Sequence, residues 1–173
     1  MIVGEGLGAV VGLEIALARP DEVAAVAMID PPVLGLLPAA TAGVSTDTEI
    51  VRETVEREGP GAAYEVFLAG GLHTLGAGAD RLGALADRGG EAARSFLVEL
   101  PAVPGWSLDP DRFGRLDSVV YLVSLADSPE LLREAADSLV GRIPSARRLE
   151  LGSSGPEASV EALAAVVAAA GPA

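Results

Sequence analysis

The stretch VGEGLG, residues 3–8, joins an apolar segment to a helical pattern over residues 7–18. Glycine has no Cβ and tolerates positive φ, so closely spaced glycines allow the backbone to turn sharply from a strand into a helix. Pro20 marks the end of the helical pattern. We therefore expect a strand over residues 1–3, a tight turn and a helix.

Two further apolar runs are typical of strands buried on both faces, as in a parallel sheet. The run VAAVAMI, residues 23–29, is closed by Asp30-Pro31-Pro32. A similar run covers residues 119–125, a further short strand is expected over residues 146–151, and each is followed by a helical pattern, the last over residues 156–170. This alternation predicts an α/β fold with a parallel sheet of about four strands and flanking helices.

Residues 33–114 interrupt the alternation. They hold short helical patterns broken by Gly and Pro, and no pattern typical of a strand. Thr46 and Glu49 form a capping box that predicts the start of a helix. Further helices are expected over residues 61–69, 79–87 and 91–99. The predicted organisation is an α/β core, residues 1–32 and 115–173, with a helical cap inserted at 33–114.

The composition excludes several kinds of function. The chain has 173 residues, enough for one domain with a hydrophobic core. Its 25 acidic and 12 basic side chains give a net charge of −13, which repels nucleic acid and anionic membranes. With no cysteine and a single histidine, neither a thiolate nor a histidine metal site is expected, and no cofactor is indicated.

The expected location is the cytoplasm. No run reaches the ~18 apolar residues of a membrane-spanning helix. The N-terminal segment has no basic region before an apolar stretch, which a signal peptide requires.

Three stretches together resemble the C-terminal two-thirds of an α/β-hydrolase. Residues 3–32 are similar to that family's nucleophile elbow, G-x-S-x-G, with its helix and next strand. Residues 100–151 are similar to the exit from the cap, the strand whose end carries the catalytic acid, and the last strand. The C-terminal helix is the third stretch. The resemblance implies a three-layer, truncated α/β-hydrolase-like fold with a helical cap.

The chain departs from this family at the catalytic triad. Gly6 stands at the position of the nucleophile, and the loop after the last strand, residues 152–156, contains no histidine. The resemblance places the acid at Asp127. Because a serine nucleophile needs both a hydroxyl and a base within reach, we expect a triad-deficient protein and not a conventional serine esterase.

The second departure concerns the edge of the sheet. The family's sheet has about four strands before the elbow, and here the strand of residues 1–3 begins the sequence. An open apolar edge invites pairing with another chain. The sequence is therefore expected to be a fragment, or to form a homodimer at this edge, or to be completed there by a separate subunit.

Three carboxylates are candidates for acid–base chemistry: Asp127, Asp30 and Glu5. Asp127 follows the strand of residues 119–125, although it or Ser128 could equally cap the next helix. Asp30 follows the neighbouring strand, where Asp-Pro-Pro also reads as a plain turn. Glu5 precedes the nucleophile position. A cluster of the three would raise at least one pKa or hold a hard cation.

Four other residues are candidates for ligand contact. Gly6 would leave an enlarged pocket, or would simply relieve a strained turn. The backbone N–H of Leu7 would meet a ligand oxygen. Trp106, after Pro104-Gly105, would anchor the exit of the cap or contact a ligand. His73 is the one side chain that titrates near neutrality without perturbation, although it reads equally as a surface residue.

Three functions fit these residues. The first is a triad-deficient protein that binds a small apolar molecule between cap and sheet, or serves as a non-catalytic partner subunit. The second is a lyase, isomerase or cyclase on the same scaffold, with the carboxylates as acid or base. The third is a dinucleotide-binding protein, because Gly4-x-Gly6-x-x-Ala9 fits the G-x-G-x-x-A fingerprint and Asp30 lies roughly 20 residues on.

Overall fold

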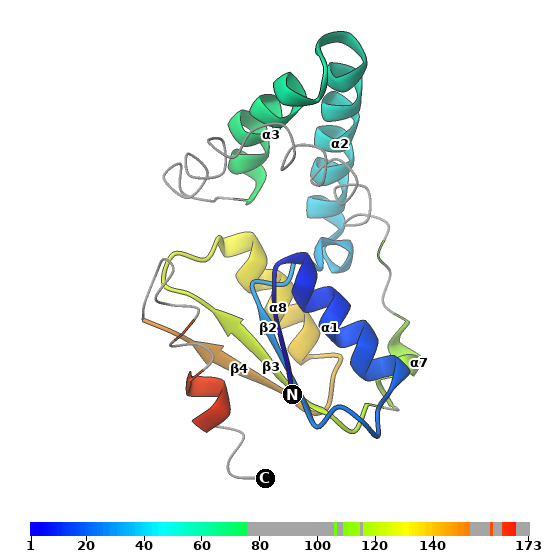
Figure 1. Ribbon diagram of the computed structural model, residues 1–173, viewed down its shortest axis with the longest axis vertical. Helices are drawn as coiled ribbons and strands as arrows, with labels where there is room; N and C mark the ends of the chain where they lie inside the picture. The colour runs from blue at the N-terminus through cyan, green and yellow to red at the C-terminus, as the bar shows by residue number, and fades with distance from the viewer. Residues whose placement is uncertain (76–105, 107–108, 115, 153–159, 161–163, 169–173) are drawn as a thin grey trace. The chain divides into compact units, whose positions relative to one another are not determined.

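The computed structural model describes residues 1–75, 106, 109–114, 116–152, 160 and 164–168 (Figure 1). The chain falls into two compact units. The first contains residues 1–33, 108–128 and 132–173, and the second contains residues 34–107 and 129–131. The predicted helices over 79–87 and 91–99 lie outside the described residues.

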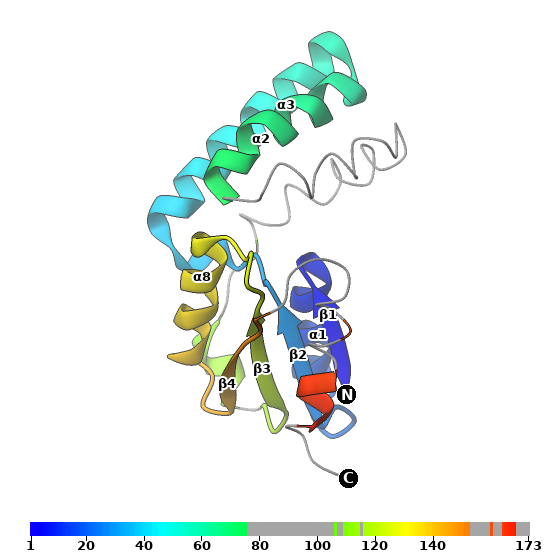
Figure 2. The ribbon, with the colours of Figure 1, turned by 90° about the vertical axis from the view of Figure 1, so that its left-hand side faces the viewer.

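The first unit is built on a four-stranded parallel sheet, as the sequence predicts. Its strands are β1 (Ile2–Glu5), β2 (Ala25–Ile29), β3 (Val119–Ser124) and β4 (Ala146–Glu150), in the spatial order β1-β2-β3-β4 (Figure 2). No end of a strand differs from its predicted position by more than two residues. The four strands are parallel, so their carboxyl ends meet at one edge of the sheet.

Two helices follow strands directly. Helix α1 (Leu7–Ala18) begins one residue after the preceding turn at Gly6, over the range that its apolar pattern predicts. Helix α8 (Glu130–Val140) follows β3. The predicted strand over 1–3 extends to Glu5, so the turn is confined to a single residue.

Both helices cover the same face of the sheet. A Cβ built on Gly12 of α1 would lie 3.0 Å from Ile2 and 3.6 Å from Val26. At the opposite edge of the sheet, Arg148 of β4 bonds to Asp137 of α8 at 2.7 Å. The register and the alternation of side chains place Ile2, Val26 and Arg148 on one face.

The opposite face is an apolar layer. On this face, side chains of β2 and β3 pack together with Val166 of the helical segment 164–168. The buried members are Ala25, Ala27, Ile29, Tyr121, Val123, Leu125 and Val166. The sheet is thus covered on both faces, which explains why β2 and β3 read as continuous apolar runs.

Side-chain bonds tie the short helix α7 (Pro110–Phe113) into the first unit. Asp109 caps α7 by accepting from the N–H of Asp111 at 3.0 Å. Arg112 donates to both carboxylate oxygens of Glu14 on α1, at 3.1 and 2.6 Å. This forked pair joins segments 98 residues apart in the sequence.

The second unit contains a helical hairpin with its own small core. The 3-10 turn η1 (Leu34–Leu36) precedes α2 (Pro38–Glu58) and α3 (Pro60–Leu75), which meet at Gly59, where φ is 89°. Val51 and Ala63 are buried between the two helices, with Val55 and Phe67 packed against them.

The predicted capping box is wrong. Helix α2 starts at Pro38, with Leu37 at its N-cap, and Thr46 lies inside the helix. There the Thr46 hydroxyl donates to the carbonyl of Ala42 at 3.1 Å. A threonine with an acidic residue three positions on is therefore compatible with a helix interior, since its hydroxyl can bond back to the preceding turn.

The turn between β1 and α1 generates the first testable prediction. A Cβ on Gly4 would lie 2.3 Å from the carbonyl oxygen of Gly8 and 2.6 Å from the nitrogen of Ala9, so Gly4→Ala forces backbone apart. We expect a loss of roughly 2–4 kcal/mol in the free energy of unfolding, measured by urea titration. Gly8→Ala is the matched control, because its Cβ meets nothing within 4 Å. Equal effects of the two substitutions would contradict this account.

Candidate functional site

The turn at Gly6 is the centre of the candidate site. Gly6 has φ 57° and ψ −127°, a combination that residues with a side chain adopt only under strain. Its N–H donates to the carbonyl of Ile29 at 2.9 Å, and its own carbonyl accepts from the N–H of Ala9 at 3.0 Å. The turn is therefore fixed on one side to β2 and on the other to the first turn of α1.

Open space surrounds this turn. A Cβ built on Gly6 would meet nothing within 4 Å, and no side chain caps the N-terminus of α1. Because the first backbone N–H groups of a helix have no partner within the helix, the N–H of Leu7 presents a hydrogen-bond donor at this end. The helix dipole adds a partial positive charge there.

Asp30 lies beside this turn, directly after β2. It is 6% exposed, and its φ of 45° is unusual for a residue other than glycine. Its N–H donates to the carbonyl of Val123 at 3.0 Å. Its carboxylate accepts from the hydroxyl of Ser128 at 2.6 Å. The backbone and side chain of Asp30 are thus both bonded to the segment formed by β3 and the turn that follows it.

Ser128 has a different role from the predicted helix cap. Helix α8 begins at Glu130, and the Ser128 hydroxyl, itself buried, accepts from the N–H of Leu125 at 2.6 Å while it donates to Asp30. This hydroxyl joins the ends of two strands. The pattern of the sequence around Ser128 signals a helix start, and nothing local indicates a contact 98 residues away.

Arg133, which the sequence analysis missed, closes the turn after β3. Its guanidinium donates to the carbonyls of Ser128 and Ala126, each at 3.2 Å, and to that of Leu125. One side chain from α8 thus bonds three carbonyls of this turn. Asp127 lies on this turn and is exposed.

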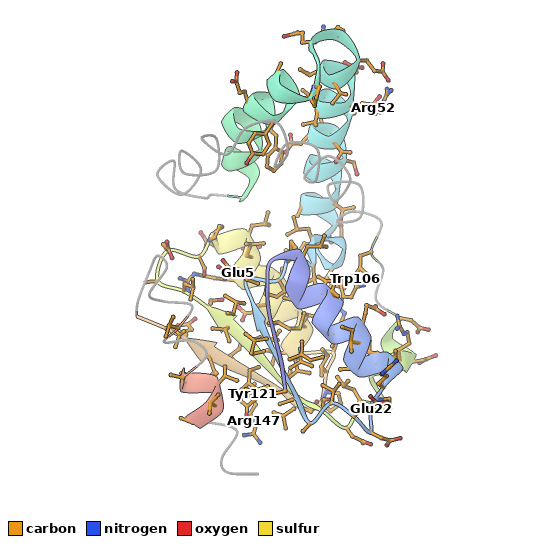
Figure 3. All side chains as sticks on the ribbon, in the orientation of Figure 1. Glu5, Glu22, Arg52, Trp106, Tyr121 and Arg147 are labelled. Carbon is orange, nitrogen blue, oxygen red and sulfur yellow. The ribbon has the colours of Figure 1, made fainter. Side chains whose placement is uncertain are left out.

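Glu5 is exposed at the carboxyl end of β1 (Figure 3). It pairs in the register with Ile29, the residue that precedes Asp30. The predicted acidic cluster has no support as a cation site. Among the residues that the structure describes, no group of three or more Asp, Glu, His or Cys side chains is placed to hold a metal ion.

The two other candidates belong to the second unit. His73 lies in α3, and its side chain is outside the described part of the chain. Trp106 is half-buried, and its carbonyl oxygen lies 2.9 Å from a Cβ built on Gly35 (Figure 3). Most of the loop at the family's histidine position, residues 153–156, also lies outside the described residues.

The fold is that of the α/β-hydrolases. The chain is similar to an α/β-hydrolase from Sphaerobacter thermophilus, with a TM-score of 0.62 and 22% identity over 95% of this chain. It is also similar to an acetylester hydrolase from Corynebacterium glutamicum, with a TM-score of 0.53 and 14% identity over 92% of this chain. A protein from Mycobacterium tuberculosis gives a TM-score of 0.53 and 15% identity over 96% of this chain.

The likeness is one of fold over part of a longer protein. The chain spans 64%, 55% and 62% of those three structures, respectively. No family model matches the sequence, and no curated protein matches it. The resemblance seen in the motifs is confirmed for the fold, whereas the roles of individual residues stay predictions.

The order of the strands argues against the dinucleotide interpretation of Gly4-x-Gly6-x-x-Ala9. In dinucleotide-binding folds the fingerprint strand lies inside the sheet, beside the point where the strand order reverses. Here β1 is an edge strand of the described sheet, and the order runs without reversal. Asp30, which would contact the ribose, instead bonds to Ser128.

None of the described helices is long and apolar enough to cross a membrane. The cytoplasmic location stays a prediction.

The bond between Ser128 and Asp30 provides the second prediction. Ser128→Ala removes one hydrogen bond from the buried carboxylate of Asp30 and one from the N–H of Leu125, so we expect the free energy of unfolding to fall by about 1–3 kcal/mol. The control is Asp127→Ala, one residue away and exposed, for which we expect a change within about 0.5 kcal/mol. Urea titration of both variants measures the difference. A Ser128→Ala protein as stable as the control would mean that this bond does not hold the two strand ends together.

Proposed function

We propose that the chain is an α/β-hydrolase-fold protein that binds a small apolar molecule at the carboxyl edge of its sheet without hydrolysing it by serine chemistry. The observation that supports this most strongly is the turn at Gly6. It combines the strained backbone of a strand-to-helix elbow with the absence of any side chain. Covalent catalysis needs a nucleophilic side chain beside a base, and Gly6 supplies none.

The surroundings of Gly6 suggest the chemistry of the ligand. The open space at Gly6 would admit part of a ligand at the position where a hydrolase of this fold carries its nucleophilic side chain. The uncapped N-terminus of α1, with the N–H of Leu7, favours an oxygen with partial or full negative charge. We therefore propose a ligand with a small apolar body and a carbonyl or carboxylate oxygen. Ligands of open α/β sheets bind outside the carboxyl ends of the strands.

A titration with sodium butyrate and sodium hexanoate, followed by ligand-observed NMR, tests the site. Gly6→Ala places a methyl group in the open space, so we expect the affinity for the bound probe to fall about tenfold, or 1.4 kcal/mol. Gly59→Ala is the matched control, since Gly59 also has a positive φ and open surroundings but lies in the helical hairpin. No saturable binding by the wild-type protein, or equal affinity in the two variants, would contradict the proposed site.

A separate assay tests the absence of serine chemistry. We expect the wild-type protein to release p-nitrophenol from p-nitrophenyl butyrate no faster than Gly6→Ala does. A serine-directed inhibitor that abolished appreciable wild-type turnover would overturn this part of the proposal and leave the binding result intact.

One observation favours a second candidate, a lyase, isomerase or cyclase on the same scaffold. Asp30 is a buried carboxylate on a residue with a left-handed backbone, and both features gather at active sites. In this alternative Asp30 would exchange a proton with the ligand, with Glu5 and Asp127 as the exposed carboxylates of the same sheet edge. Asp30→Asn would then abolish turnover and preserve binding.

We also propose that another polypeptide completes the sheet at β1, as a partner subunit. Within the described residues β1 pairs on one side alone, with β2. An edge of this kind offers backbone hydrogen bonds to an additional strand.

A further inference from the structure

Gly6 and Asp30 are neighbours at the carboxyl edge of the sheet. The register pairs Glu5 with Ile29, and the N–H of Gly6 donates to the carbonyl of Ile29 at 2.9 Å. Gly6 and Asp30 each follow one member of this pair. Because neighbouring strands lie about 4.8 Å apart, the open space at Gly6 has an acidic residue close beside it.

The bond from Ser128 favours the ionised form of Asp30. The Ser128 oxygen accepts from the N–H of Leu125 at 2.6 Å, so its own proton is presented to the Asp30 carboxylate, also at 2.6 Å. A hydrogen bond donated to a carboxylate stabilises the charged form of that group. Asp30 is therefore expected to carry a negative charge at this edge.

The positive charge of Arg133 offsets this negative charge only in part. Arg133 bonds to backbone carbonyls of the turn that carries Ser128. Its guanidinium also lies 3.7 Å from the carboxylate of Glu150 on β4. The charge of Arg133 is thus shared with a carboxylate other than that of Asp30.

Burial distinguishes Asp30 from the two other carboxylates discussed for this edge. Asp30 is 6% exposed, whereas Glu5 and Asp127 are exposed to solvent. Water and salt screen charges at the surface, and they screen buried charges much less. Of these three carboxylates, Asp30 therefore acts most strongly on a ligand bound at Gly6.

We propose that Asp30 is a specificity-determining residue of the site at Gly6. Its buried negative charge disfavours carboxylates and selects an uncharged ligand, which presents a carbonyl oxygen to the N–H of Leu7. The inference rests on the ligand site proposed above. It narrows the ligand from a molecule with a carbonyl or a carboxylate oxygen to an uncharged carbonyl compound, such as a carboxamide or a ketone.

Two electrostatic effects act on an anion at Gly6, and their sizes decide the preference. The strand spacing and the length of an aspartate side chain place the two negative charges about 6–8 Å apart. At an effective dielectric constant of about 20, repulsion over that distance weakens binding roughly 30- to 100-fold. The positive end of α1 strengthens the binding of an anion by about two- to fivefold. Repulsion is the larger effect, so an uncharged carbonyl is favoured over a carboxylate.

Butyramide and butyrate form a matched pair of probes, because they share one carbon chain and differ in charge. We expect the dissociation constant of butyrate, measured by ligand-observed NMR at pH 7 and low salt, to be at least tenfold higher than that of butyramide. Butyrate binding in the millimolar range is still measurable by this method. Butyramide should displace butyrate, and Gly6→Ala should weaken both probes, since both occupy the same space.

Asp30→Asn removes the charge and retains the shape of the side chain. The amide oxygen of asparagine still accepts from Ser128, and asparagine is among the residues that tolerate a left-handed backbone. We expect the ratio of the butyrate and butyramide dissociation constants to fall at least tenfold. A general loosening of the structure would weaken both probes alike and leave this ratio unchanged.

Asp117→Asn is the matched control, since Asp117 is exposed and lies at the amino end of β3, away from this edge. We expect the ratio to change by less than about twofold, and urea titration should show both variants to be folded. A wild-type protein that binds butyrate as tightly as butyramide would overturn the inference and leave the site at Gly6 standing. An unchanged ratio in Asp30→Asn, or an equal change in Asp117→Asn, would do the same. Failure of both probes to bind would overturn the site and this inference with it.

Discussion

The close approach of two backbone segments at Gly4 is the constraint on which the rest of the first unit depends. The Cα of Gly4 lies so near the carbonyl of Gly8 that any side chain would overlap backbone atoms. This approach lets α1 reverse direction after one residue and lie directly on the strand that it leaves. The unusual dihedral angles of Gly6 follow from the same reversal, since the chain must complete it between Glu5 and Leu7.

A second set of contacts fixes the carboxyl edge around that turn. The hydroxyl of Ser128 bonds to the carboxylate of Asp30, and Arg133 bonds to the carbonyl of Ser128 on the turn after β3. The N–H of Gly6 bonds to the carbonyl of Ile29 at the end of β2. These bonds connect the ends of β2 and β3 to each other and to α8. An edge held by such bonds, with open space where Gly6 would carry a Cβ, is suited to the proposed ligand, because binding and catalysis both require a fixed orientation.

The sequence was most informative where a single short segment determines the structure. Residues 23–29 and 119–125 are apolar at every or nearly every position because both faces of their strands are covered, so their identity as strands was predictable. The elbow was predictable from its glycine spacing.

The sequence was least informative where partners are remote or where local signals have two meanings. Thr46 satisfies its hydroxyl inside a helix as well as at a helix start, so its spacing to Glu49 could not locate the start of α2. The contact between Ser128 and Asp30 crosses 98 residues and depends on the pairing of β2 with β3. The turn at Gly6 was therefore predictable, and the groups that bond around it were not.

The backbone of Gly6 also has a consequence for how this chain can evolve. A residue with a side chain would occupy those dihedral angles at a cost of order 1–3 kcal/mol, which hydrolases of this fold accept at their nucleophile. A substitution of Gly6 by serine would therefore lower stability at once, while a working triad would still need a base and an acid within reach. Selection acts on that immediate loss. New activity at this edge would therefore arise more readily at Asp30 or on the turn after β3 than by a substitution of Gly6.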